Sequence, residues 1–273
     1  MIPWGQIDEW RQQAPWSQDL QVEQDLILSR ALVEVFEQPA VARSLALRGG
    51  TALFKLQIRP ALRYSEDIDL VQLTAEPIGP TLDAIRHALD PWLGEPRRKF
   101  SEGRVTLVYR MMSEGPPPLP LRLKIEINSR EHFSVFGVER FPFAVRSRWF
   151  DGEADVVSYL PEELLGTKLR ALYQRKKGRD LFDLAVGIER LEVDLEQIIR
   201  VFSRYMEHGG TRVSRAEFEL NLHGKLMDPT FIGDLQPLIA PGFDWSFETG
   251  AAVVRENLLV LLRGEPWREA EVL

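Results

Sequence analysis

The chain has 273 residues, a formal net charge of −7 and no cysteine. The absence of cysteine excludes disulfides, thiolate metal sites and a cysteine nucleophile, and the four scattered histidines form no His-x3-His zinc pair. The acidic balance excludes a uniformly basic surface that coats nucleic acid, but it leaves room for a local basic patch. Because the first residues lack a secretory signal and no stretch reaches the ~20 apolar residues of a membrane span, we expect a cytoplasmic enzyme or binding protein.

The first part of the chain mixes helices with strands. Apolar residues recur at helical spacing over residues 21–38, which predicts an amphipathic helix closed by Pro39. The short apolar segment 41–47 predicts a buried strand, and it leads through Gly49-Gly50-Thr51 into a predicted helix at residues 52–56. Proline cannot donate to a central ladder, so Pro116-Pro117-Pro118 predicts a loop. Further along we predict strands at 67–73, 105–111, 121–128 and 141–149, and a helix at 80–93.

After Pro161 every predicted element is a helix. Proline is tolerated at a helix start, and Gly178 predicts a stop between two helices. We therefore expect two domains: an α/β domain with an N-terminal helix over residues 1–155, and a helical domain over residues 156–273. The predicted helices of the second domain cover residues 162–175, 180–190, 195–207, 216–225 and 249–262.

Acidic residues mark one face of two predicted strands. Asp67 and Asp69 alternate along the first strand, so both project from the same face. Two carboxylates on one face repel each other and require a cation or water, and hard oxygen ligands select magnesium or manganese. On the strand at 121–128 the leucines and isoleucines form one face, and the other face carries Arg122, Lys124, Glu126 and Asn128. Glu126 is therefore a candidate third carboxylate for a site that holds two divalent ions.

The segment Gly49-Gly50-Thr51 supplies a candidate anion site. Glycine lets backbone amides approach a phosphate closely, a helix N-terminus attracts it, and the Thr51 hydroxyl adds a donor. Taken alone, each feature has a simpler explanation. A diglycine is more often a turn, an Asp-x-Asp pair is more often a solvated strand edge, and a glutamate such as Glu126 is more often a surface residue. The occurrence of all three features in this order favours a nucleotide- and metal-binding site.

Four segments resemble the motifs of one family. Gly49-Gly50-Thr51 with Ser65-Glu66-Asp67-Ile68-Asp69-Leu70 resembles the first motif of the AbiEii nucleotidyltransferase toxins, which include the mycobacterial MenT toxins and belong to the polymerase-beta-like superfamily. Residues 124–127 resemble the second motif, 162–171 the third and 179–184 the fourth, in the same order over residues 45–190. The resemblance implies an α+β fold, with a mixed-sheet polymerase-beta-like core followed by an all-helical C-terminal part.

The resemblance also implies a function. It points to a toxin that transfers a nucleoside monophosphate from a nucleoside triphosphate to RNA, such as the 3′ end of transfer RNA, and so blocks translation in a type IV toxin–antitoxin system. It implies Mg²⁺ or Mn²⁺ as cofactor and an antitoxin encoded by a neighbouring gene. Two alternatives stay open: nucleotidyl or phosphoryl transfer to a protein hydroxyl, and a catalytically silent nucleotide-binding module.

By the same resemblance, Asp67 and Asp69 ligate the metal, and Glu126 completes the site or acts as a general base. Ser65 lies at the rim, where it binds phosphate or is itself phosphorylated. Lys124 either neutralises phosphate charge or pairs with an acid across the strands. The residues expected to bind nucleotide are Gly49, Gly50, Thr51, Ser65, Lys124, Lys168 and Asp183.

The third and fourth motifs add candidate catalytic residues on helices. Lys168 lies beside an apolar helix stripe, so it must be paired or line a cleft. It contacts the triphosphate as a point charge, or it is a snorkelling surface lysine. Asp180 positions Lys168 or the acceptor, or it stabilises the start of its helix. Asp183, one turn on, is an equal candidate for the functional acid.

A basic run follows the third motif. A phosphate backbone is one partner for such a run, which makes it a candidate RNA-binding segment. The alternative is a solvated loop between helices. The run contains Arg170, Arg175, Lys176, Lys177 and Arg179, and a weaker second patch is Arg97-Arg98-Lys99.

Overall fold

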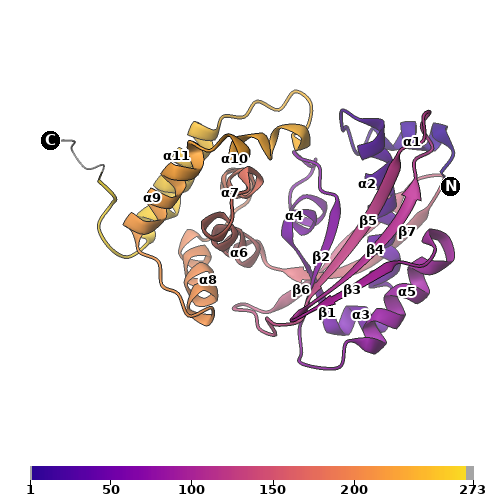
Figure 1. Cartoon of the computed structure of the whole chain (residues 1–273), viewed down its shortest axis with the longest axis horizontal. Coiled ribbons are helices and arrows are strands. Elements are labelled where there is room, and N and C mark those ends of the chain that lie inside the picture. Colours follow the sequence, from indigo (N-terminus) through magenta and orange to yellow (C-terminus); the bar gives the residue numbers. More distant parts are fainter. Residues whose placement is uncertain (1, 269–273) are drawn as a thin grey trace. The chain divides into compact units, whose positions relative to one another are not determined.

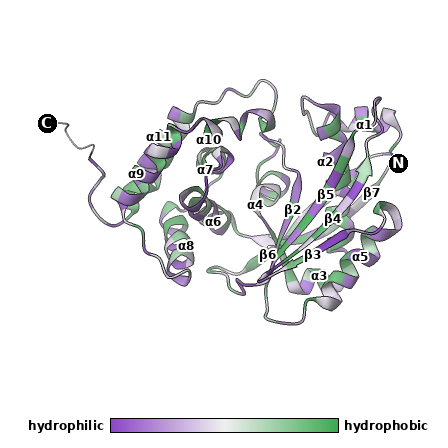
Figure 2. Cartoon of the chain, viewed as in Figure 1, coloured by the Kyte–Doolittle hydropathy of each residue, from purple (hydrophilic) through white to green (hydrophobic). Residues whose placement is uncertain are grey.

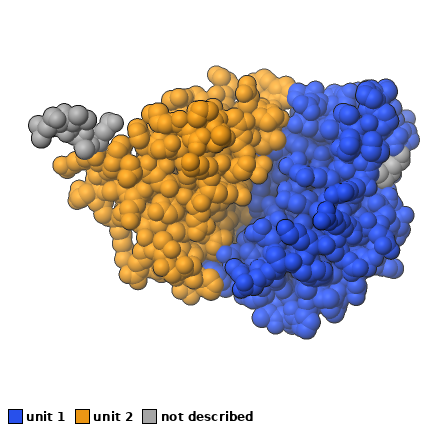
Figure 3. Space-filling model, viewed as in Figure 1, with its two compact units in different colours: residues 1–159 blue, residues 160–273 orange. Residues whose placement is uncertain are grey.

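The computed structural model describes residues 2–268, and the chain divides into two compact units. The first unit runs to Tyr159 and the second begins at Leu160 (Figure 3). This division follows strand β7 (Asp151–Tyr159), so a boundary after residue 155 would fall inside that strand. Within residues 2–268, no helix has the length and apolar character needed to cross a membrane.

The first unit is built on a seven-stranded mixed sheet with the strand order β3-β4-β5-β2-β1-β7-β6 (Figure 1). Strand β2 is parallel to β5 and β1 is parallel to β7, whereas the other neighbours are antiparallel. The mixed sheet that the family resemblance implies is therefore present. The remaining strands are β1 (Leu45–Arg48), β2 (Asp67–Gln72), β3 (Arg97–Ser101), β4 (Arg104–Met112), β5 (Pro120–Asn128) and β6 (Val138–Arg146).

Helices cover the apolar face of this sheet. On β5, Leu123, Ile125 and Ile127 are fully buried, while the alternate residues are polar and partly exposed. This alternation shows in Figure 2 as changes between green and purple along the strands. Helix α2 packs on β5 and β7, and α5 packs on β4. The helices of this unit are α1 (Trp4–Trp10), α2 (Asp19–Phe36), α3 (Pro39–Ser44), α4 (Gly49–Ala52), the π-helix η1 (Leu53–Gln57) and α5 (Gly79–Leu93).

Several local predictions for this unit differ from the structure, and strand β7 (Asp151–Tyr159) was not predicted at all. Residues 41–47 were expected to form one strand, but α3 takes up Pro39–Ser44 and leaves only Leu45–Arg48 extended. Pro39 is preorganised for the first position of a helix, so it opens α3 in addition to ending α2. Strand β3 was not predicted as a strand. All five of its residues are exposed, so it has no apolar alternation to recognise.

The second unit is helical, as predicted. Helix α6 packs on α7 and α8, and α11 packs on α7. Gly178 begins α7 instead of ending α6, which ends at Gln174. It lies against the Phe231 carbonyl and the Phe247 ring, where a side chain has no room. The helices are α6 (Pro161–Gln174), α7 (Gly178–Arg190), α8 (Leu195–His208), α9 (Arg215–Leu226), α10 (Pro229–Gly233), η2 (Gln236–Leu238), α11 (Phe247–Asn257) and η3 (Leu259–Leu261).

Candidate active site

The two central strands bring three carboxylates to one face of the sheet. In the parallel pairing of β2 with β5, Asp67 lies opposite Lys124 and Asp69 lies opposite Glu126. Residues that lie opposite each other project to the same face. The structure therefore brings together Asp67, Asp69 and Glu126, the residues that the sequence analysis assigned to one site, and their chemical role stays a prediction.

The diglycine turn lies directly against this site. Gly49 has a φ of +79°, and a Cβ atom there would lie 2.8 Å from Oδ2 of Asp69. A Cβ atom on Gly50 would collide with the guanidinium of Arg63. Each glycine is thus required for a different reason. Gly49 allows the positive φ of the turn and the close approach of Asp69, whereas Gly50 leaves room for the Arg63 side chain.

Thr51 and Ser65 hold the start of strand β2. The Thr51 hydroxyl donates a hydrogen bond of 2.6 Å to the carbonyl oxygen of Asp67, and it lies 2.8 Å from Oγ of Ser65. Thr51 is only 1% exposed. Because its hydroxyl is buried and already bonded, we assign Thr51 to positioning Asp67 and not to contacting the nucleotide, while Ser65 stays partly exposed.

Basic side chains balance part of the negative charge. Nζ of Lys124 lies 2.6 Å from Oδ2 of Asp67 and 3.8 Å from Oε2 of Glu126. Arg104 also pairs with Glu126, with 3.3 Å between its Nε and Oε1 of the glutamate. Lys124 is thus the cross-strand partner of an acid in this structure, and its contact with phosphate stays a prediction.

Burial and neighbouring charges shift the pKa values of Asp67 and Lys124. Burial raises the pKa of Asp67; Lys124 opposes the shift, and the charges of Asp69 and Glu66 add to it. Burial lowers the pKa of Lys124, but the hydrogen bond and charge of Asp67, helped by Glu126 and Asp69, outweigh burial and raise it. Lys124 is thus protonated, and Asp67 is harder to ionise than an ordinary aspartate.

The donor set at this face suits a small, hard cation. Among the described residues, no group of three or more His, Asp or Glu side chains is arranged as a ready metal site. Asp67 and Asp69 nevertheless offer partly exposed carboxylate oxygens on one face, and the pKa of Asp67 is raised mainly by burial, with a smaller contribution from the charges of Asp69 and Glu66. Oxygen donors of this kind fit Mg²⁺ or Mn²⁺, whereas Glu126 is engaged by Lys124 and Arg104.

The candidate residues of the second unit form a separate, buried cluster. Nζ of Lys168 lies 2.6 Å from Oδ2 of Asp183 and 3.4 Å from Oδ1 of Asp180. Arg175 binds both carboxylate oxygens of Asp180, at 2.6 and 2.7 Å. Both aspartates are fully buried, and Lys168 is 6% exposed. Burial raises the pKa of Asp180, but the charges of Lys168 and Arg175 and the Arg175 hydrogen bonds outweigh it, so that pKa lies below its ordinary value of 3.8.

Acidic partners offset much of the basic run at the start of α7. Arg170 lies over the Tyr205 ring, with 4.9 Å from its Cζ to the ring centroid. The other members have carboxylate partners: Arg175 with Asp180, Lys176 with Asp228 at 3.1 Å, and Lys177 and Arg179 with Asp234 at 2.9 and 3.8 Å. The segment therefore presents less free positive charge than its sequence implies.

Two arginines beside the site were given no role from the sequence. Arg63 is 3% exposed, donates to the carbonyl of Tyr64 at 2.9 Å, and lies over the Phe54 ring. Arg48 is the register partner of Asp69 and forms an ion pair of 3.1 Å with Glu131. Both arginines belong to the segments that also contain the diglycine and the aspartate pair, and this proximity was the available signal.

Comparison with known proteins gives one family and several similar structures. A family model described as nucleotidyl transferase AbiEii toxin, type IV TA system, matches residues 30–253. The solved structure of MenT4, a nucleotidyltransferase toxin of Mycobacterium tuberculosis, superposes with a TM-score of 0.64 at 16% identity, covering 96% of this chain and 91% of that one. This similarity confirms the predicted α+β fold class. No curated protein sequence matches this chain.

Two further solved structures are less similar. A provisionally assigned nucleotidyltransferase from H. pylori gives a TM-score of 0.49 at 18% identity, covering 84% of this chain and 88% of that one. An antigenic nucleotidyltransferase-like protein from Paracoccidioides brasiliensis gives 0.39 at 18% identity, covering 66% and 87%. Similarity at this level carries no argument about function.

Proposed function

Since this chain belongs to the AbiEii family of nucleotidyl transferase toxins of type IV toxin–antitoxin systems, we propose that it transfers a nucleoside monophosphate from a nucleoside triphosphate to the 3′ end of an RNA. Transfer RNA is the proposed acceptor, and the proposed consequence is a block of translation in the cytoplasm. The observation that carries the proposal is the placement of Asp67, Asp69 and Glu126 on one sheet face beside the diglycine turn.

The proposed reaction is an in-line displacement. The acceptor 3′ oxygen forms a bond to the α-phosphorus, the bond from that phosphorus to the bridging oxygen breaks, and pyrophosphate leaves. We assign Glu126 to accept the hydroxyl proton and Lys124 to neutralise charge on the phosphates. Such catalysis consists mainly of positioning and charge stabilisation, which rigid strands provide.

Asp67 and Asp69 are the residues that would hold Mg²⁺ or Mn²⁺. A bound ion of this type stabilises negative charge on the transferring phosphoryl group and lowers the pKa of an attacking hydroxyl. The chain itself contributes the spacing of the two carboxylates along β2 and the hydrogen bond from Thr51 that holds the Asp67 backbone. Relief of the repulsion between the two aspartates favours a cation at this position.

The second unit supplies the remaining proposed residues. The family resemblance assigns Lys168 to the triphosphate and Asp180 or Asp183 to the support of Lys168. The ion pairs of Lys168 with both aspartates fit a supporting role for these acids. We further propose that an antitoxin, encoded by a neighbouring gene, is the protein partner.

The test is label transfer by the purified full-length protein. The protein is incubated with total RNA, Mg²⁺ and each of the four α-labelled nucleoside triphosphates in turn. We expect label in RNA of transfer RNA size, loss of label with EDTA, and recovery when Mg²⁺ or Mn²⁺ is restored. Absence of labelled RNA with every nucleotide would refute the RNA acceptor.

Intact-mass spectrometry of the protein after the same incubation tests the other acceptor class. We expect an unchanged mass. A gain of one nucleotide monophosphate or one phosphate would instead indicate transfer to a protein hydroxyl. Ser65 is the candidate for that modification, because its hydroxyl is partly exposed two residues before Asp67.

A further inference from the structure

The polar face of strands β3, β4 and β5 carries rows of basic residues that end at the carboxylate site. In the strand register, Arg97 lies opposite Val108, Val108 opposite Lys124, and Lys124 opposite Asp67. The next row runs from Lys99 through Thr106 and Glu126 to Asp69. Because opposed residues share a face, the edge strand β3 presents its cations on the same face as the two aspartates.

A third row places two arginines directly against each other. Arg110 on β4 is the register partner of Arg122 on β5, and both side chains are exposed. Like charges directly opposite each other across a sheet are destabilising. Within the described part of the chain, no ion pair involves Arg97, Lys99, Arg110 or Arg122. These four residues, which we call the basic sheet face, thus differ from the basic run near α7, most of which has acidic partners.

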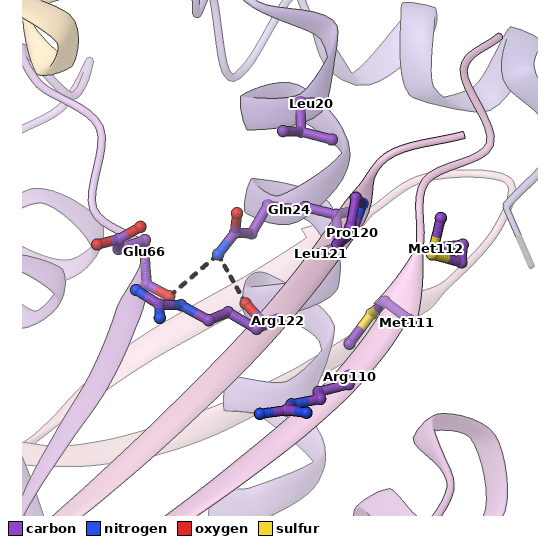
Figure 4. Close-up of a pocket in the computed structure, with 9 residues that line it drawn as sticks. All are labelled: Leu20, Gln24, Glu66, Arg110, Met111, Met112, Pro120, Leu121 and Arg122. Atoms are coloured by element: carbon purple, nitrogen blue, oxygen red, sulfur yellow. Dashed lines mark hydrogen bonds between the residues drawn. The ribbon is translucent and has the colours of Figure 1, made fainter. Parts of the chain in front are cut away.

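A pocket of about 600 Å³ lies at the Arg110–Arg122 end of this face. Figure 4 shows both arginines extending in the same direction from their strands, with Glu66, Met111 and Met112 also on the pocket wall. Gln24 donates to the carbonyl of Arg122 at 2.8 Å and to that of Glu66 at 3.5 Å, which ties the ends of β5 and β2 together. Glu66 immediately precedes Asp67, so the pocket borders the carboxylate site.

We infer that the basic sheet face binds the phosphodiester backbone of the acceptor RNA near its 3′ end. In this inference Arg110 and Arg122 hold one or two phosphates, and the pocket receives the adjoining nucleoside against its apolar wall. It rests on the proposed function, because it names the surface that presents the RNA to the carboxylates.

The chemistry of the surface favours RNA over an acidic protein. Guanidinium groups match phosphate oxygens with paired hydrogen bonds. Neighbouring strands lie about 4.8 Å apart, and the cations of Arg110 and Arg122 adjoin an apolar hollow. A nucleotide has this combination of an anionic group and an apolar ring. In a chain with an overall charge of −7, a local cluster of unpaired cations favours an anionic ligand.

The test is fluorescence anisotropy of a labelled single-stranded RNA with a free 3′ hydroxyl, over a series of salt concentrations. The variant is the double substitution Arg110→Gln with Arg122→Gln. The matched control is Arg140→Gln, an exposed arginine on β6 for which the described residues provide no ion pair. Loss of two phosphate contacts predicts binding at least about tenfold weaker and a salt slope lower by about 1.4, at about 0.7 per contact.

The control variant should bind RNA like the unmodified protein. The double variant should keep its melting temperature, because removing two opposed like charges does not destabilise a sheet. Its affinity for a nucleoside triphosphate should also stay within about twofold. If triphosphate binding falls as much as RNA binding, the arginines serve the nucleotide substrate and the inference is overturned.

Three further outcomes separate this inference from the proposed function. Equal RNA binding by the double variant and the unmodified protein overturns the inference, even if label transfer to RNA occurs. Weaker RNA binding by the double variant supports it, even if the unmodified protein transfers no label and the proposed function fails. A third outcome concerns polyglutamate. If the unmodified protein binds polyglutamate as tightly as RNA, and the double variant loses that binding, the face binds an acidic protein and the inference is overturned.

Discussion

The two charged clusters, one in each unit, differ in how their charges are balanced. On the sheet of the first unit, the carboxylates of Asp67 and Glu126 are 22% and 23% exposed, and burial and like charge raise the pKa of Asp67. In the second unit, Asp180 and Asp183 are fully buried, and Lys168 and Arg175 lower the pKa of Asp180. One cluster keeps an excess of negative charge near solvent, and the other pairs its charges away from solvent.

This difference in charge balance leads to different expectations for the two clusters. Repulsion that persists in the folded protein costs stability, and such costs concentrate at functional sites. A buried, balanced cluster is destabilising mainly when one partner is removed. Substitutions in the first cluster should therefore affect activity without lowering the free energy of unfolding. Substitutions in the second cluster should lower the free energy of unfolding in addition to any effect on the proposed contact of Lys168 with the triphosphate.

The largest expected effect is the loss of transfer activity in the Asp69→Asn variant. Loss of one metal-binding carboxylate should lower the rate of label transfer by on the order of 10³–10⁴-fold. The melting temperature should stay the same or rise, because the repulsion with Asp67 is removed. The control is Asp83→Asn, an exposed acid on α5, which should change neither quantity. An unchanged transfer rate for Asp69→Asn would contradict the assignment of Asp69 to metal binding and, with it, the expected contrast between the two clusters.

The second largest expected effect is a lower free energy of unfolding in the Lys168→Met variant. The substitution leaves Asp180 and Asp183 short of one cation in a buried site, so the free energy of unfolding should fall by about 3–5 kcal/mol. Denaturant unfolding measures it. Lys176→Met is the matched control, because its ion pair with Asp228 is exposed and should be worth about 1 kcal/mol or less. An unchanged free energy of unfolding for Lys168→Met would contradict the structural part of this prediction, and loss of transfer activity in such a stable variant would support the proposed triphosphate contact alone.

A smaller effect is expected from Gly49→Ala. The positive φ should cost about 1–3 kcal/mol of stability, and the new methyl group should displace Asp69 and lower the transfer rate by about 10²-fold. Gly224→Ala on α9 is the control, because no atom lies within 4 Å of its added Cβ. That control should raise stability by about 0.5–1 kcal/mol. Full activity of Gly49→Ala would show that Asp69 does not depend on the turn.

The smallest effect is a pH dependence in the second unit. Lys225 is 4% exposed, and its ammonium donates to the carbonyls of Leu172 and Tyr173. Burial lowers the pKa of Lys225 to about 8, despite the charge of Asp180. Between pH 8 and the ordinary Lys pKa of 10.5, the folded state binds fewer protons than the unfolded state, so stability should increase with pH.

The increase from this one group should be on the order of 1–2 kcal/mol over the two pH units above 8. It is measured as the difference between the unmodified protein and Lys225→Met in denaturant unfolding at each pH. Parallel stability curves for the two proteins would show that Lys225 does not titrate in this window.

Local patterns in the sequence determined much of the first site. The alternation of polar and apolar residues correctly predicted β2 and β5, and it placed Asp67 with Asp69 on one face and Glu126 on a polar face. The motif order also identified the family. Alternation predicts these faces because successive side chains of a strand point to opposite sides of the sheet, so neighbouring residues in the sequence suffice to assign them.

Tertiary structure alone decided how these strands pair and which charges are satisfied. The register that sets Asp69 against Glu126 joins residues 57 positions apart, and Lys168 meets Asp183 across two helices. It also decided that exposed β3 joins the sheet and that Arg110 faces Arg122. Pairing and burial depend on contacts between segments distant in sequence, and no local periodicity records them.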